Sequence, residues 1–332
     1  MPHSVVIAPD SFKGSISARD AAAAVAAGWR SARPLDTIAT LPQADGGEGT
    51  LDAVETAVPG TERRLVSSVT GPDRRPVDAS WLLLPDGTAL VELAESSGLP
   101  LMGRLDPLGA TTRGLGEVIA AALADHPLRL LVGLGGSAST DGGAGVLEVV
   151  PALDLEVVLL TDVTSPLLGP AGAAAVFAPQ KGATPGQVAE LEARLAGLAA
   201  RLGGRPTAAG AGAAGGTAWG LATAWGASIQ SGSDFLAGLT GLDAAIAGAT
   251  VVLTGEGRFD TQSLGGKVVG RVLDTAAARG VTAGVIAGEL AVAPTVWSRS
   301  LTALAGSRES ALAEPARWLA AAGAEAARTI LN

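Results

Sequence analysis

Short apolar runs that end in loops rich in glycine and acidic residues recur along this chain. The first run covers residues 5–8 and ends at Pro9-Asp10, and a helix is expected over residues 18–29, because Ser17 and Asp20 have the spacing of an N-terminal cap. A second strand over residues 37–41 leads into a glycine-rich loop and another helix. This order predicts a parallel α/β sheet, in which the loops after the strands bind ligands.

The pattern changes over residues 63–93. Short strands are expected at residues 65–69, 77–84 and 88–93, separated by Gly-Pro-Asp and Pro-Asp-Gly turns. An antiparallel meander of this kind lies outside a parallel sheet. We therefore expect a second domain to begin here.

The rest of the chain returns to alternating strands and helices. Helices are expected at residues 111–124 and 184–202, with strands beginning at residue 128 and covering residues 156–160. The last third predicts three strands and two helices. The strands cover residues 250–253, 282–287 and 301–304, and the helices end near Arg279 and cover residues 310–331.

The loop after Leu130–Val132 is the richest in glycine. It has six glycines between Gly133 and Gly145 and a single acid, Asp141. Glycines let the backbone approach a ligand closely, and free N–H groups ahead of a helix favour anions. The loop therefore predicts a phosphate site, although a plain strand-to-helix connection would use the same glycines. The expected phosphate-binding residues are Gly135, Gly136, Ser137, Gly142 and Gly143.

Composition narrows the class of partner. The 332 residues suffice for two domains, and 48% hydrophobic content is typical of a compact globular protein. A net charge of −9 argues against nucleic acid and anionic membrane surfaces, so a small molecule is the expected partner. No secretory signal opens the chain and it has no cysteine, which makes a cytoplasmic location the expectation.

Scarce residue types limit the chemistry. Only three lysines occur, and Lys13, Lys181 and Lys267 each lie beside a glycine, as suits a compact ammonium that contacts phosphate. The two histidines, His3 and His126, are poorly placed for catalysis. A histidine-based triad, a cysteine nucleophile and a histidine-rich zinc site are thus unexpected, and acids, bases and metal ligands must come mainly from Asp and Glu.

Four segments together resemble the bacterial glycerate kinase family whose first strand ends in APDSFKGS. They follow the family's order and span nearly the whole chain, with supporting matches at residues 162–164, 179–182 and 210–216. The four segments are residues 8–15 (APDSFKGS), 44–50 (ADGGEGT), 135–145 (GGSASTDGGAG) and 254–267 (TGEGRFDTQSLGGK).

The resemblance implies an α/β fold with two domains and an active site in the cleft between them. It implies a Rossmann-like parallel-sheet domain of residues 1–60, 127–150 and 245–332, and an inserted α/β domain of residues 61–126 and 151–244. The implied activity is ATP-dependent, magnesium-dependent phosphorylation of D-glycerate to 2-phosphoglycerate or 3-phosphoglycerate.

Phosphoryl transfer requires positioning and charge neutralisation, which suggests roles for the conspicuous residues. Residues 135–137 are expected to hold ATP phosphates, while Lys13 or Lys267 offsets charge at the γ-phosphoryl group. Asp10, Asp260 and Asp141 compete for the role of base. The expected magnesium ligands are Asp45 and Asp162, and the expected substrate contacts are Ser11, Arg258, Gly46, Gly47 and Glu48.

Several departures from the family keep other functions open. Thr140 and Ser165 replace residues that are usually Asn, the chain is short between residues 145 and 156, and Glu289 replaces a usual Ser. A nucleotide-binding regulatory protein and a kinase of a related hydroxy acid are the alternatives. The pattern Gly133-x-Gly135-x-x-Ala138 also fits a loose dinucleotide fingerprint, but an NAD-dependent oxidoreductase is the least favoured. The oligomeric state stays open, a homodimer included.

Overall fold

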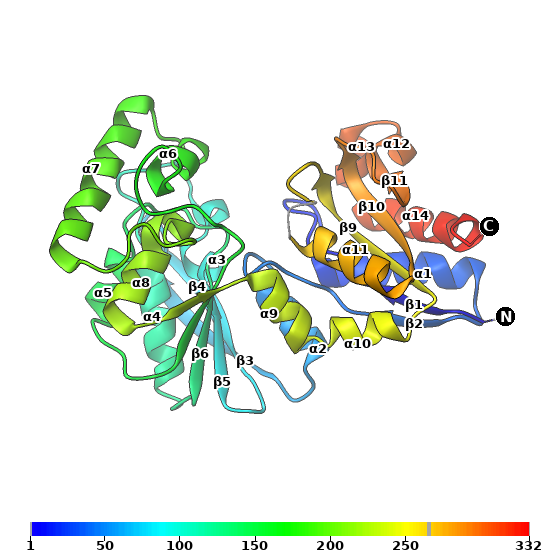
Figure 1. The fold of residues 1–332 in the computed structure, drawn as a ribbon, viewed down its shortest axis with the longest axis horizontal. Helices are drawn as coiled ribbons and strands as arrows, with labels where there is room; N and C mark the ends of the chain where they lie inside the picture. Colours follow the sequence, from blue (N-terminus) through cyan, green and yellow to red (C-terminus); the bar gives the residue numbers. More distant parts are fainter. Residues whose placement is uncertain (1, 264–266, 332) are drawn as a thin grey trace. The chain divides into compact units, whose positions relative to one another are not determined.

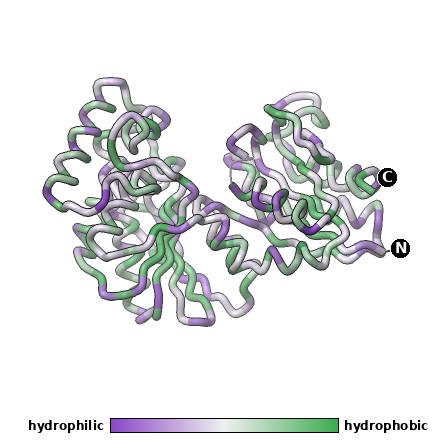
Figure 2. The backbone as a smooth tube through the Cα atoms, in the orientation of Figure 1, coloured by the Kyte–Doolittle hydropathy of each residue, from purple (hydrophilic) through white to green (hydrophobic). Residues whose placement is uncertain are grey.

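The computed structural model describes residues 2–263 and 267–331 and divides the chain into two compact units. Unit 1 consists of Met1–Asp45, Asp52–Val58 and Ser233–Asn332. Unit 2 consists of Gly46–Leu51 and Pro59–Gly232. Each unit has its own sheet (Figure 1), and Figure 2 shows that hydrophobic residues are concentrated on the strands.

The sheet of unit 1 is entirely parallel, in the order β11-β10-β9-β1-β2. The chain passes from β1 to β2, which lies on one side of β1. On the other side of β1 lies β9, and the chain passes from β9 to β10, which lies farther from β1. The carboxyl ends of β1 and β9 therefore form a topological switch point, where open α/β sheets bind ligands. The strands are β1 (Ser4–Ile7), β2 (Thr37–Thr40), β9 (Val251–Phe259), β10 (Thr282–Leu290) and β11 (Trp297–Ser300).

Helices cover both faces of this sheet. Helices α1 and α14 pack with each other over one face, around buried Trp29, while α10 and α11 pack over the other face, around buried Val252. Gly28 and Gly323 lie at the α1–α14 contact. The helices with residues in unit 1 are α1 (Ala18–Ala32), α2 (Thr50–Ala57), α9 (Gly232–Leu239), α10 (Leu242–Ala247), α11 (Val268–Arg279), α12 (Leu301–Ala305), α13 (Arg308–Ala313) and α14 (Pro315–Thr329).

Local sequence explains how α1 and α14 form and meet. The Ser17 hydroxyl caps α1 by accepting a hydrogen bond from the Asp20 amide at 3.0 Å, as the spacing predicts. A Cβ atom on Gly28 would lie 1.9 Å from the carbonyl oxygen of Ala320 in α14. Glycine is therefore required where these helices cross.

The sheet of unit 2 is mixed, in the order β3-β4-β5-β6-β7-β8. The expected meander forms its antiparallel half, and the strands from β5 onward pair in parallel. The meander thus continues a parallel sheet at one edge and does not stand apart from it. The strands are β3 (Glu62–Thr70), β4 (Pro76–Leu83), β5 (Thr88–Glu92), β6 (Arg129–Gly133), β7 (Val157–Leu160) and β8 (Ser228–Gln230).

The core of unit 2 lies between this sheet and helices α4, α5 and α8, and a smaller core lies beneath α6 and α7. Helix α7 begins with a capping box, in which Thr184 and Gln187 bond reciprocally at its first turn. The helices are α3 (Leu93–Ser97), α4 (Arg113–Leu123), α5 (Ala144–Val149), α6 (Ala173–Phe177), α7 (Pro185–Leu202) and α8 (Thr217–Trp225), with short 3₁₀ turns η1 (Leu99–Leu101), η2 (Pro179–Lys181) and η3 (Ala213–Gly216).

Four predictions from the sequence need correction. Residues 127–150 belong to unit 2 and not to the Rossmann-like unit, because β6 pairs with β5 and β7. Residues 301–304 form helix α12 and not a strand; the Ser300 hydroxyl caps this helix, and the last strand ends before it. The terminal helix is two helices, separated at Glu314-Pro315, where proline cannot continue the α13 hydrogen-bond pattern.

Residues 233–244, predicted for the inserted domain, likewise belong to unit 1. Among residues 2–263 and 267–331, no helix combines the length and apolar character needed to span a membrane.

Candidate active site

The candidate active site is a pocket of unit 1 at the switch point between β1 and β9. The chain beyond β1 still follows β9, because Ala8 donates to the Leu253 carbonyl and Asp10 to the Gly255 carbonyl, both at 2.8 Å. This pairing carries Asp10 to the carboxyl edge of the sheet beside Glu256. A Cβ atom on Gly255 would lie 1.9 Å from the Ile286 carbonyl oxygen, so a side chain there would push β9 and β10 apart.

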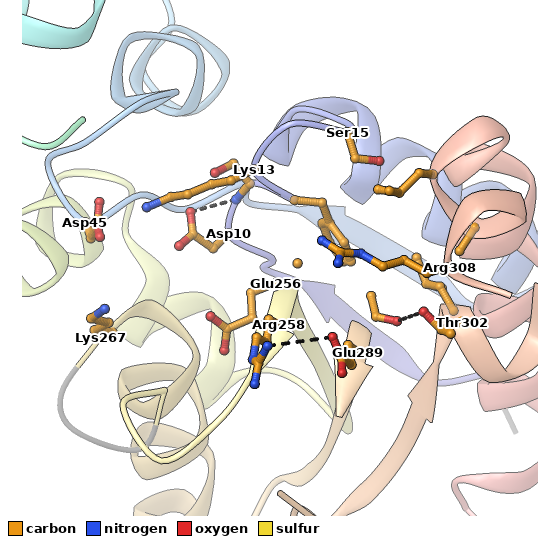
Figure 3. Close-up of a pocket in the computed structure, with 17 residues that line it drawn as sticks. Asp10, Lys13, Ser15, Asp45, Glu256, Arg258, Lys267, Glu289, Thr302 and Arg308 are labelled. Carbon is orange, nitrogen blue, oxygen red and sulfur yellow. Dashed lines mark hydrogen bonds and ion pairs between the residues drawn. The ribbon is translucent and has the colours of Figure 1, made fainter. Parts of the chain in front are cut away.

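The pocket has a volume of about 290 Å³ and brings residues of several elements together (Figure 3). The loop after β1 and the ends of β9 and β10 supply most of its polar side chains, and α12 and α13 supply an apolar wall. Its lining residues are Asp10, Ser11, Phe12, Lys13, Ser15, Asp45, Glu256, Gly257, Arg258, Lys267, Gly288, Glu289, Leu301, Thr302, Arg308, Ala311 and Leu312.

Asp10 is the most perturbed acid of this pocket. Burial, together with the negative charges of Asp45 and Glu256, raises the pKa of Asp10 from 3.8 to about 7, while Lys13 and the Ser11 amide oppose the rise. The Ser11 amide donates to Asp10 Oδ1 at 2.6 Å, which fixes the orientation of the carboxyl group. A carboxyl group with a pKa near neutrality can accept and release protons at physiological pH.

Within the part of the chain that the structure describes, two buried polar atoms of the pocket have no hydrogen-bond partner. They are the hydroxyl oxygen of Ser11 and the Oε1 atom of Glu256. Burial raises the pKa of Glu256 too, against the opposing effects of Ser263, Lys267 and Lys13. Because buried polar groups are normally paired, these atoms indicate positions where a bound ligand would complete the hydrogen bonding.

Lys13 lies at an exposed turn that the chain holds firmly on both sides. Phe12 is buried and donates to the Ile16 carbonyl at 3.0 Å, and Gly14 has a φ of +73°, which allows the turn. Lys267 lies at the N-terminal cap of α11. Both lysines line the pocket together with Asp10. The Gly265-Gly266 pair of the same motif lies outside the described residues.

Arg258 and Asp260 lie in a more open position. The Arg258 side chain is 63% exposed. Its Nε atom lies 3.8 Å from Asp260 Oδ2, and its Nη1 atom lies 3.9 Å from Glu289 Oε2. Asp260 holds the turn after β9, since its Oδ1 accepts from the Gln262 amide at 2.8 Å and its amide donates to Ser263 at 2.9 Å. Asp260 is not one of the lining residues, so the geometry favours Asp10 over Asp260 as the base.

In unit 2, the segment around Gly46 packs against the glycine-rich loop. The Gly135 amide donates to the Gly46 carbonyl at 3.0 Å, and a Cβ atom on Gly135 would lie 2.3 Å from the Gly47 Cα. Buried Glu92 accepts from the amides of Gly49 and Leu51 at 3.0 and 3.1 Å, at the first turn of α2. Glu48 is exposed beside this contact.

Much of the glycine-rich loop uses its amides within the fold. Gly142 donates to the Gly215 carbonyl at 3.0 Å and Gly143 to Asp141 at 3.1 Å. With the Gly135 bond to Gly46, three of the amides expected to bind phosphate are already paired, so these glycines serve close packing. Gly136 is exposed, and Ser137 is buried with its hydroxyl 3.2 Å from that of Ser139. The expected phosphate contact thus narrows to Gly136 and Ser137.

Asp141 organises the loop and is a poor candidate for the base. It accepts from the amide and hydroxyl of Thr112 at 2.9 and 2.8 Å, and from the amides of Gly143 and Gly145 at 3.1 and 3.3 Å. A carboxylate with four donors is committed to holding the starts of α4 and α5. Catalysis by Asp141 would require these bonds to break.

The two expected metal ligands lie in different units. Asp45 lines the pocket of unit 1, whereas Asp162 of unit 2 accepts a hydrogen bond from the Ser231 hydroxyl at 2.8 Å. Within residues 2–263 and 267–331, no three His, Cys, Asp or Glu residues are grouped so as to hold a metal ion. Magnesium needs only one or two protein carboxylates beside water and phosphate, and Asp45 with the unpartnered oxygen of Glu256 fits that donor set.

Glu256 and Arg308 line the pocket but were not among the candidates from the sequence. The sequence does carry a signal for Glu256, because this acid lies between two glycines in the carboxyl-terminal half of a strand, as the other candidate acids lie near glycines at strand ends. Arg308 has no comparable local signal. It reaches the pocket only because α13 packs against α12 and α14, and α12 packs against β10.

Comparison with known proteins agrees with this fold. The model of the glycerate kinase family matches residues 5–153 and 148–331, two segments that meet where the chain is expected to be shorter than the family. A solved structure of a Salmonella typhimurium LT2 protein assigned as glycerate kinase 2 has a TM-score of 0.81 and 32% identity, covering 100% of this chain and 99% of that one. This likeness confirms the α/β fold.

Similar curated proteins include two that are named as glycerate kinases. A glycerate 2-kinase of Escherichia coli is 37% identical, covering 80% of this chain and 79% of its own length. A glycerate kinase of Bacillus subtilis is 39% identical, covering 79% of each chain. An uncharacterized protein of Mycobacterium tuberculosis is 41% identical, covering 99% of this chain and 92% of its own. With the switch-point pocket and the family match over nearly its whole length, the chain belongs to the glycerate kinase family.

Proposed function

We propose that this protein transfers the γ-phosphoryl group of ATP to a hydroxyl group of D-glycerate, giving ADP and 2-phosphoglycerate or 3-phosphoglycerate. The observation that carries the proposal is Asp10, whose pKa is raised to about 7 in a pocket that also holds two lysines and three further acids. Phosphoryl transfer requires positioned charge more than covalent chemistry, and this set of side chains supplies it. We place the reaction in the cytoplasm, where ATP is available.

Asp10 is the base in this proposal. Its deprotonated carboxylate accepts the proton of the glycerate hydroxyl as the hydroxyl oxygen forms a bond to the γ-phosphorus, and the bond from the γ-phosphorus to the bridging oxygen of ADP breaks. The Ser11 amide, 2.6 Å from Oδ1, holds the carboxylate in place. Because the pKa of Asp10 is about 7, its carboxyl group can take up and release a proton in this step at neutral pH. The carboxylate of Asp260 instead accepts a hydrogen bond within the turn after β9.

Lys13 and Lys267 offset the negative charge that develops on the transferred group. Lys13 is assigned the larger role, because it is carried on the same short loop as Asp10 and lowers the pKa of Asp10 electrostatically. Lys267 lowers the pKa of Glu256 in the same way. Gly136 and Ser137 are assigned to the ATP phosphates, and Ser11, Gly46, Gly47 and Glu48 to substrate contacts.

When bound with ATP, magnesium would offset the negative charge of the phosphate groups. Asp45 is assigned as its first protein ligand. Glu256 and Asp162 are alternatives for the second, and the unpartnered Oε1 atom of Glu256 favours Glu256. Direct or water-mediated contact would satisfy either carboxylate.

An assay of ADP release by the purified protein tests the proposal. With ATP and magnesium, release should depend on D-glycerate, and phosphorus NMR of the product should show one phosphoglycerate per ADP. ATP binding without glycerate-dependent ADP release would instead support a nucleotide-binding regulatory protein. A panel of short hydroxy acids, compared by kcat/KM, would reveal a kinase whose preferred acceptor is a relative of glycerate.

A further inference from the structure

Arg308 is a cation of the pocket, and among the described residues no acidic side chain pairs with it. It is the first residue of α13, and Figure 3 shows its side chain extending from that helix into the pocket, towards the side that holds Asp10 and Glu256. Over residues 2–263 and 267–331, no hydrogen bond or ion pair joins Arg308 to another side chain. Arg258, in contrast, is shared between Asp260 and Glu289.

The surroundings of Arg308 favour a strong contact with an anion. Ala311 and Leu312, three and four residues further along α13, lie on the same face of the helix and line the pocket with it. Buried Leu301 and Phe12 contribute to the same apolar lining. Arg308 itself is exposed, and apolar side chains cannot accept its hydrogen bonds, so its guanidinium is open to a charge-assisted hydrogen bond with an anionic ligand.

The pocket has acidic side chains around Asp10 and a separate cation, Arg308, on another wall, which suits the hydroxyl and carboxylate ends of a hydroxy acid. Asp10, Asp45 and Glu256 would repel a carboxylate near the base, even with Lys13 and Lys267 beside them. A short hydroxy acid has an anionic end and a hydroxyl end. If the hydroxyl meets Asp10, the carboxylate is best stabilised by a cation approaching from another wall, and Arg308 is the cation that α13 supplies.

We propose that the guanidinium group of Arg308 binds the carboxylate of the hydroxy acid substrate and thereby selects acids over neutral alcohols. The inference rests on the proposed function, since it names the group that recognises the acceptor. It assigns to Arg308 the contact with the substrate carboxylate, in place of Arg258, which the sequence predicted as a substrate contact. A guanidinium can make two parallel hydrogen bonds to a carboxylate, which lysine cannot reproduce.

Steady-state kinetics of Arg308→Gln and Arg308→Lys test this assignment. Loss of a paired contact to a charged group should raise the KM for D-glycerate by about 10- to 100-fold in Arg308→Gln, with the KM for ATP unchanged within about twofold. Arg308→Lys should give an intermediate KM, because it keeps the charge without the fork. Circular dichroism and the thermal midpoint verify that the exposed substitution leaves the fold intact.

A neutral substrate analogue separates carboxylate recognition from a general effect on the pocket. Glyceramide has the hydroxyl groups of glycerate but no carboxylate, so the ratio of kcat/KM for glycerate to that for glyceramide should fall in Arg308→Gln. Arg30→Gln is the matched control, since Arg30 is an exposed residue of α1 outside the pocket. It should leave both the KM and the ratio unchanged.

Calorimetric binding of D-glycerate, without ATP, tests the contact independently of turnover. Binding to the wild-type protein that weakens in Arg308→Gln would support the assignment, even if no phosphoryl transfer were seen and the proposed function failed. An unchanged affinity and KM for glycerate in Arg308→Gln would overturn it. An equal loss for glyceramide, or a rise in the KM for ATP alone, would also overturn it, the latter by showing that Arg308 serves phosphate.

Discussion

The buried ammonium of Lys181 donates a hydrogen bond to the carbonyl oxygen of Ser139 in the glycine-rich loop of unit 2. Lys181 is only 3% exposed, and burial lowers its pKa from 10.5 to about 8, although the charge of Asp141 opposes the change. A lysine that the sequence suggested for phosphate contact is therefore part of the support of the loop. It joins the η2 turn to the segment that carries Ser137.

Replacing Lys181 by Met should change how stability depends on pH. The unfolded chain binds the Lys181 proton up to about pH 10.5 and the folded chain only to about pH 8, so between these values the wild type gains stability as pH rises. Lys181→Met should lose this gain, and it should raise the KM for ATP by loosening the loop. Urea unfolding at pH 7.5, 9 and 10 measures the difference, with Lys13→Met as a control for loss of an exposed lysine. Equal pH slopes in Lys181→Met and the wild type would contradict the assignment.

Asp10→Asn should stabilise the protein while it abolishes turnover. The folded protein keeps the Asp10 proton up to about pH 7 and the unfolded chain only to about 3.8, so the wild type loses stability as pH rises through that window. Above pH 7 the variant should be more stable by about 1–3 kcal/mol, with the difference vanishing below pH 4. Thermal unfolding in metal-free buffer measures this effect. Asp260→Asn, in the turn after β9, should show neither the stabilisation nor a comparable loss of kcat.

Lys13→Arg should retain the fold but lose most of its turnover. The guanidinium is bulkier than an ammonium and spreads its charge, so it neutralises a phosphoryl group less well at a confined position. A fall in kcat of at least about 100-fold is expected, with a small change in the KM for glycerate. Lys267→Arg is the matched comparison in the same pocket. Wild-type kcat in Lys13→Arg would refute its role in catalysis.

Magnesium titrations distinguish the proposed metal ligands. Asp45→Asn should raise the magnesium concentration for half-maximal activity by about tenfold, because a carboxylate ligand becomes a neutral amide. Glu256→Gln and Asp162→Asn identify the second ligand, since only the variant of that ligand should show a similar rise. Glu289→Gln controls for loss of an exposed acid of the pocket. If Asp45→Asn had the magnesium dependence of the wild type, its assignment would be withdrawn.

Two glycine substitutions in unit 2 should have opposite effects on stability. Gly135→Ala places a Cβ atom 2.3 Å from the Gly47 backbone, so it should destabilise the protein by about 2–4 kcal/mol. Gly197, exposed within α7, has no atom within 4 Å of such a Cβ. Gly197→Ala should instead stabilise the protein by about 0.5–1 kcal/mol through helix propensity. Chemical denaturation measures both, and a neutral Gly135→Ala would show that the close packing is not needed.

Much of the local structure is encoded close to each residue. Ser17 caps α1 as predicted, because capping depends on residues three positions apart, and α7 lies within the helix expected over residues 184–202. The sequence also predicted the strand–loop–helix order that carries Asp10 and Lys13, and it showed the resemblance to the family. The resemblance rests on glycines and charged residues at strand ends, which local patterns reveal.

Tertiary structure decided which of these segments share a sheet or a pocket. Residues 129–133 join β5 and β7 in unit 2, although their sequence fits a strand of either domain, because strand pairing depends on the neighbours that folding makes available. Asp141 resembles a catalytic acid in sequence, yet its four donors come partly from Thr112, twenty-nine residues away. Arg308 reaches the pocket only through the packing of α13. Long-range packing sets the partners and the pKa of each charged group. The periodicity of hydrophobic residues along the sequence does not by itself specify that packing.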